Sequence, residues 1–109
     1  MVIGTTMVAS NSENGNIDVN DVSNVAASVA AGQQTYSVSG TYWTNSWNYT
    51  NWVVSITNHG SNTITLVSIN GSQQSLAPNA NIATTGSGTL NVALWSNDNM
   101  NATVVVGWY

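Results

Sequence analysis

Five aromatic side chains gathered within twelve residues are the strongest indication of a binding site in this sequence. The stretch TYWTNSWNYTNW, residues 41–52, separates them only by Thr, Ser and Asn. An uncharged site of rings, amides and hydroxyls suits a neutral ligand such as a sugar, whose apolar face stacks on an aromatic ring. The same rings suit the lipid–water interface or a cage for a quaternary ammonium group. The five residues are Tyr42, Trp43, Trp47, Tyr49 and Trp52.

The alternation of a β-strand sorts these rings onto two faces. Side chains two positions apart point to the same side of a strand, unless Asn45-Ser46 forms a turn and breaks the register. One face is expected to fill the core, because the sequence contains no Phe and large aromatic residues are usually buried. The other face is expected to meet a ligand or a partner. One face carries Trp43, Trp47 and Tyr49, the other carries Tyr42 and Trp52, and further candidate ligand-binding residues are Trp95, Trp108 and Tyr109.

The sequence contains few residues that could carry out catalysis. The only histidine, His59, lies in the turn Asn58-His59-Gly60, and no nucleophile motif accompanies it. Glycoside hydrolysis needs two opposed carboxylates, and Asp98 is the only acidic residue after residue 32. The sequence therefore predicts a protein that is not an enzyme and that uses no cofactor.

Residues 10–21 partly resemble an EF-hand calcium loop. Gly15, Asp18 and Asp21 fall at the expected offsets, and a helix is expected to follow. Ser occupies the first and third ligand positions, however, and the loop ends in a short Asp rather than a bidentate Glu. A polar turn that caps the following helix is the preferred interpretation, so no metal site is predicted.

The near absence of charge excludes several functions. The chain of 109 residues has no Lys or Arg and four acidic residues, which gives a formal net charge of −4. Nucleic-acid binding through phosphate contacts, attachment to anionic lipid and a Walker-type phosphate site all require basic residues. No apolar run reaches the roughly 18 residues that a transmembrane helix needs. Because little colloidal repulsion remains, a homo-oligomer is expected.

The beginning of the chain bears on its location. The first ten residues lack the basic region of a signal peptide, and their apolar run is short. Cysteine is absent, so the sequence predicts no disulfide bond. We expect an extracellular or secreted protein, without a signal peptide visible in this numbering.

Hydrophobic spacing divides the single expected domain, residues 1–109, into an N-terminal part, 1–32, and a strand-rich part, 33–109. Residues 1–10 read as a lone strand or arm, and apolar residues at helical spacing predict a short amphipathic helix over 19–31. After Gly32 the period becomes two. We therefore expect a mainly β fold, an antiparallel β-sandwich of about seven strands with one short N-terminal helix. The expected turns lie at 59–61, 70–72, 78–79, 86–88 and 97–99.

The C-terminal stretch TLNVALWSNDNMNATVVVGWY, residues 89–109, resembles the middle of the actinoporin-like cytolysins, relatives of the fungal fruit-body lectins. That family has a similar strand, a polar turn and an apolar strand ending in Pro-Tyr. The resemblance implies a sandwich that docks on choline lipids and then inserts an N-terminal helix, here 19–31, into the membrane. Of the family's choline-site residues on this strand only Tyr109 matches, because Val106 replaces a Ser and Trp108 replaces a Pro.

Three functions follow from these observations as hypotheses. The first is a non-enzymatic, lectin-like module that recognises neutral glycan through Trp and Tyr together with Asn, Ser and Thr side chains. The second is a membrane-active cytolysin that binds choline lipid headgroups. The third is a self-assembling extracellular filament or coat subunit, in which the apolar arm 1–10 adds a strand to a neighbour's sheet.

Overall fold

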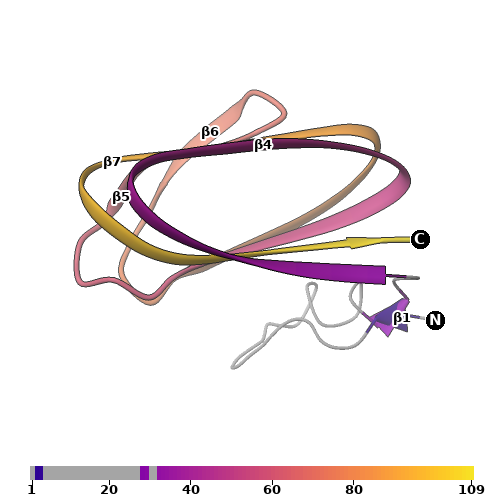
Figure 1. Ribbon diagram of the computed structural model, residues 1–109, viewed down its shortest axis with the longest axis horizontal. Coiled ribbons are helices and arrows are strands. Elements are labelled where there is room, and N and C mark those ends of the chain that lie inside the picture. The colour runs from indigo at the N-terminus through magenta and orange to yellow at the C-terminus, as the bar shows by residue number, and fades with distance from the viewer. Residues whose placement is uncertain (1, 4–27, 30–31) are drawn as a thin grey trace.

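The computed structural model of the chain describes residues 2–3, 28–29 and 32–109 (Figure 1). Near the N-terminus, strand β1 (Val2–Ile3) pairs antiparallel with β3 (Ser28–Val29). The helix expected over 19–31 and the loop at 10–21 lie outside the described residues, apart from the two residues of β3.

The main sheet contains four strands, all paired antiparallel in the order β4-β7-β5-β6. Their bounds are β4 (Gly32–Asn58), β5 (Ile64–Ile69), β6 (Ser72–Leu76) and β7 (Asn81–Trp108). The described part of the chain contains no helix. The prediction of a mainly β, antiparallel fold is therefore confirmed.

Strands β4 and β7 are very long, and Figure 1 shows them sweeping round together in wide curves. Residues 52–57 of β4 pair with β7 along both edges, so that Ile56 lies opposite Ile82 on one side and Val104 on the other. A segment bonded to both ends of the same strand means that the curved ribbon closes back on itself.

The pairing divides the ribbon into two arrays of four segments each. The first array has the lateral order 32–40, 100–108, 52–58 and 81–86. The second array has the order 42–49, 88–95, β5 and β6. Each of the two long strands contributes to both arrays, and the register shifts between Gly40 and Tyr42 and between Tyr49 and Trp52 mark the corners of β4.

The inward-facing residues of both arrays belong to one hydrophobic core. Val54, Ile56 and Val104 from the first array are fully buried, as are Leu90 and Leu94 from the second. Burying one such side chain stabilises a fold by about 1.5–3 kcal/mol relative to leaving it exposed. Buried and exposed positions alternate over most of both strands, which is the period-two pattern that the sequence predicts, whereas residues 52–56 of β4 are all buried.

Turns interrupt the strands at three of the five predicted places, 59–61, 70–71 and 78–79. The β5–β6 hairpin turns on Asn70-Gly71, whose φ angles of 50° and 86° are both positive, as a two-residue type I′ turn requires. The predicted turns at 86–88 and 97–99 are wrong, because β7 runs through both as strand. Both are corners instead, and Gly88 with a φ of 80° provides the bend at one of them. The seven short strands are therefore not confirmed.

Candidate ligand-binding surfaces

Three aromatic rings from β4 form a cluster at the side of the molecule where β4 is the outermost strand of both arrays. Tyr36 lies 5.8 Å from Trp43 and 5.6 Å from Trp47 between ring centroids, and the two tryptophans are 6.3 Å apart. The indole Nε1 of Trp47 donates a hydrogen bond of 3.1 Å to the Tyr36 hydroxyl. All three are half-buried and pack against the core. The cluster therefore closes this side of the core, and the hydrogen bond between Trp47 and Tyr36 fixes two of its three rings to each other.

Inward and outward side chains alternate along residues 42–49, as predicted for the aromatic face that carries Trp43, Trp47 and Tyr49. Trp43, Trp47 and Tyr49 are half-buried on the inward side, while Tyr42 is exposed on the other. The strand continues through Asn45-Ser46 without a turn.

Trp52 does not share a face with Tyr42, contrary to the prediction. It is only 4 % exposed and belongs to the core cluster. The register shift between Tyr49 and Trp52 is the physical reason, because it breaks the strict alternation before Trp52 is reached. The Trp52 ring lies over Gly86, where a Cβ atom would come within 2.6 Å of Cη2.

Tyr49 and Trp108 form a second aromatic contact near the C-terminus. Their rings are stacked, with centroids 4.9 Å apart and planes inclined by 13°. Burial raises the pKa of the Tyr49 hydroxyl, and the nearby Tyr36 raises it further. Tyr109 follows as an exposed residue, and its backbone N–H donates to the carbonyl of Asn51 at 3.1 Å. Of the eight predicted site residues, Tyr42, Trp95 and Tyr109 are thus the exposed ones.

The structure brings Tyr42 and Trp95 together although they are far apart in sequence. They are directly opposite on 42–49 and 88–95, and Leu66 of β5 lies opposite Trp95 on its other side. Tyr42 is 60 % exposed and Trp95 is 41 % exposed. Directly opposite residues have Cβ atoms only about 4.5–5.5 Å apart. An apolar row of three residues therefore crosses the solvent-facing side of the second array.

Small polar side chains continue from this row along the same face. The next row is Thr44, Ala93, Ser68 and Gln73, and beyond it follow the pairs Ser46–Asn91 and Asn48–Thr89. The Ser46 hydroxyl donates to Oδ1 of Asn91, and the Thr44 hydroxyl donates to the carbonyl of Val92 at 2.9 Å. We call these two rows and two pairs, starting at Tyr42–Trp95–Leu66, the outer face. It carries no charged side chain.

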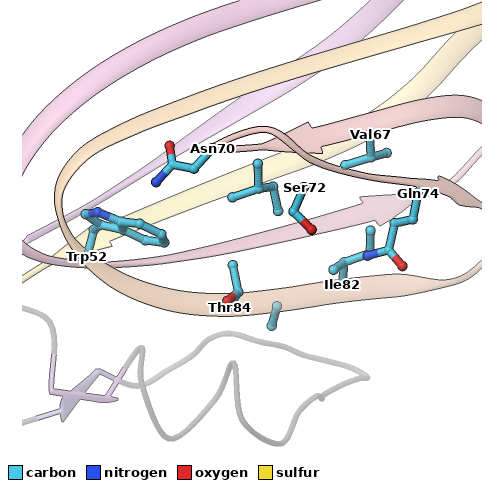
Figure 2. A pocket seen from close by; sticks show the side chains of 9 residues that line it. Trp52, Val67, Asn70, Ser72, Gln74, Ile82 and Thr84 are labelled. Carbon is cyan, nitrogen blue, oxygen red and sulfur yellow. The ribbon is translucent and has the colours of Figure 1, made fainter.

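A second feature, which sequence reasoning missed, is a hollow of about 500 Å³ on the side away from the aromatic cluster (Figure 2). It lies between the β5–β6 hairpin and residues 82–84 of β7, and Trp52 lines it as well. Figure 2 shows Val67 and Gln74 on the hairpin side and Ile82 and Thr84 on the β7 side. The alternation of β6 contained a signal for it, since Ser72 and Gln74 fall on the same face as the buried Leu76.

His59 and Asp98 both lie at exposed positions, His59 in the loop after β4 and Asp98 at a corner of β7. His59 is exposed, and its Nε2 forms a hydrogen bond of 2.9 Å with the Thr103 hydroxyl. Asp98 lies on the exposed corner after Trp95, where its backbone N–H donates to the Ser96 hydroxyl. Among residues 2–3, 28–29 and 32–109 there is no group of three or more His, Cys, Asp or Glu residues placed to hold a metal ion.

Comparison with known proteins identifies no relative of this chain: no family model, no curated protein and no solved structure matches it. The resemblance to the actinoporin-like cytolysins therefore stays a prediction. Within the described part of the chain, no helix has the length and apolar character needed to cross a membrane.

Proposed function

We propose that this protein is a non-enzymatic, lectin-like module that binds neutral glycan on the outer face. The observation that carries the proposal is the exposed cross-strand pair Tyr42–Trp95, followed along the sheet by hydroxyl and amide side chains. A sugar ring stacks its apolar face on an aromatic side chain, and its hydroxyls exchange hydrogen bonds with Ser, Thr, Asn and Gln. Without a charged group, the face favours an uncharged ligand.

The architecture in this proposal is a β-sandwich of the jelly-roll type. The two four-segment arrays are its two layers, and the shared core fills the space between them. Two long strands that cross from one layer to the other produce the eight-segment order that is typical of jelly rolls, a fold used by lectin and capsid domains. Because a fold hosts many functions, this supports the proposal less than the outer face does.

The test is a binding titration of the purified protein with soluble neutral oligosaccharides, namely glucose, mannose and galactose oligomers, by isothermal calorimetry. We expect saturable binding of one type, and we expect Tyr42→Ala and Trp95→Ala each to raise Kd about tenfold or more, which corresponds to 1.4 kcal/mol. Tyr109→Ala is the matched control, because Tyr109 is about as exposed as Trp95 but lies outside the outer face. Equal losses in all three variants would contradict the assignment.

A second candidate, the self-assembling coat or filament subunit, is favoured by the outer edge of β4. Along 32–49 no described strand pairs with the outer edge, and this stretch contains neither charge nor Pro, the features that normally prevent edge-to-edge association. Light scattering tests it: Asn48→Lys on this edge should reduce the assembly size, and Asn62→Lys in an exposed loop should not. A monomer at millimolar concentration would exclude this candidate.

A further inference from the structure

The hollow beside Trp52 has the dimensions of a small-molecule site. Its volume of about 500 Å³ lies within the range of about 300–1,000 Å³ that is typical of ligand pockets. It reaches from the exposed residues Ser72 and Gln74 to the buried residues Trp52 and Val67, so it connects the surface with the core. It opens between the two arrays, whereas the outer face lies on the solvent side of one array.

The walls of this hollow combine apolar and uncharged polar groups. Trp52, Val67, Ile69 and Ile82 supply the apolar surface. Asn70, Ser72, Gln74 and Thr84 supply amides and hydroxyls, and Figure 2 shows them around the same space. A lining without any ionisable side chain disfavours anions and cations, because a buried charge needs a partner. The matching ligand is a neutral ring with one apolar face and several hydroxyl groups.

Trp52 contributes a small aromatic surface to the lining of the hollow, with 4 % of the residue exposed. Its indole lies at one end of the hollow, beside Asn70 (Figure 2). The buried Nε1 of Trp52 has no hydrogen-bond partner among the described residues. Leaving a buried donor unsatisfied costs about 1–3 kcal/mol. Trp52 therefore brings an apolar ring to one end of the hollow, while its Nε1 is buried out of reach of a ligand there.

We propose that the hollow is a second ligand site, which takes a single neutral sugar residue against Trp52. The ligand class rests on the proposed function, but the site is separate from the outer face. A glycan chain lies along the outer face, whereas the hollow accepts one ring between the β5–β6 hairpin and residues 82–84. Both sites use the same hairpin, whose alternate side chains point in opposite directions.

The experiment is a titration of the ¹⁵N-labelled full chain with methyl glucoside, methyl galactoside, methyl mannoside and N-acetylglucosamine, observed by NMR. The five tryptophans give five indole N–H signals, which Trp→Phe variants assign. The Trp52 signal reports on the hollow, and the Trp95 signal reports on the outer face. We expect one of the four sugars to shift the Trp52 signal in a saturable manner.

A pair of variants completes the test. Ser72→Phe places a ring in the mouth of the hollow and should abolish the shift of the Trp52 signal, raising Kd at least tenfold. Ser75→Phe adds the same ring to an equally exposed position on the opposite face of β6 and should leave the shift unchanged. If Trp95 alone responds, the hollow is not a site and the proposed function stands. If Ser72→Phe leaves the shift of the Trp52 signal unchanged, the sugar binds elsewhere and the hollow is not a site. If Trp52 alone responds, the hollow is a site for a single sugar. If no indole signal responds to any of the four sugars, the second site is overturned, and the oligosaccharide titration alone decides on the outer face.

Discussion

Gly86→Ala tests the packing of Trp52, on which both the core and the hollow depend. A Cβ atom at residue 86 would lie 2.6 Å from Cη2 and 2.9 Å from Cε2 of Trp52, and closer still to Cζ2. Ordinary carbon contacts are about 3.5–4.0 Å, so the indole must shift by roughly 1 Å or more. The backbone conformation at residue 86 does not require glycine, because the φ of Gly86 lies outside the positive region. The effect of the substitution is therefore steric.

The expected loss of stability follows from where the ring can go. Overpacking a well-filled core costs about 1–3 kcal/mol, and losing a large aromatic side chain from it costs about 3–5 kcal/mol. Trp52 has the hollow beside it, so the ring can move without leaving the core. Replacing Gly by Ala also stabilises the native state by about 0.4–1 kcal/mol through the unfolded chain. We expect a net loss of about 2 kcal/mol, or a fall in Tm of about 8–16 °C.

Urea unfolding followed by far-UV circular dichroism measures this loss. Ser87→Ala is the matched control, because Ser87 is the exposed neighbour of Gly86 in β7, and we expect a change of about 0.5 kcal/mol or less. In a Trp52→Phe background the smaller ring should accommodate residue 86, so the cost of Gly86→Ala should fall by about 1 kcal/mol or more. An unchanged cost in that background would refute the steric explanation.

Three further predictions concern polar groups and charge. The fully buried Asn58 donates through Nδ2 to the carbonyls of Asn62 and Leu76, so Asn58→Ala should cost about 2–4 kcal/mol in urea unfolding. Because burial raises the pKa of Tyr49 above the value of 10.0, the unfolded chain loses this proton first as the pH increases. The contribution of Tyr49 to stability should therefore be constant below pH 10 and fall above it, and Tyr49→Phe should reduce the loss of stability above pH 10. Glycan binding on the uncharged outer face should change less than about twofold in Kd between low and high salt, as measured by calorimetry.

The local features of the fold could be predicted from the sequence because they depend on neighbouring residues. The period of two after Gly32 identifies strands, and Asn70-Gly71 identifies the hairpin turn, since both φ angles there are positive. Neighbouring residues cannot tell a turn from a corner within a strand. Gly86-Ser87-Gly88 has the composition of a turn, yet β7 stays paired on both sides of it.

The sites were harder to predict because they depend on pairing between distant segments. Tyr42 and Trp95 were both candidates, but their position opposite one another follows from the register between β4 and β7. Trp52 was assigned to the wrong face, because one register shift reverses which side a residue faces. The hollow arises where Ser72 and Gln74 occupy inward positions, and its volume depends on how the two arrays meet.

Asn70 links the local and the distant features of this molecule. Its φ of 50° helps to form the hairpin turn. Its side-chain Oδ1 accepts a hydrogen bond of 2.7 Å from the backbone N–H of Asn91, and its Nδ2 donates one of 3.0 Å to the carbonyl of Thr89. Asn91 and Thr89 belong to the outer face, and Asn70 itself lines the hollow. In a chain without basic residues, such side-chain amides replace ion pairs in fixing one segment to another. The same amides and hydroxyls that hold the hairpin in register therefore also form the polar surroundings of both proposed sites.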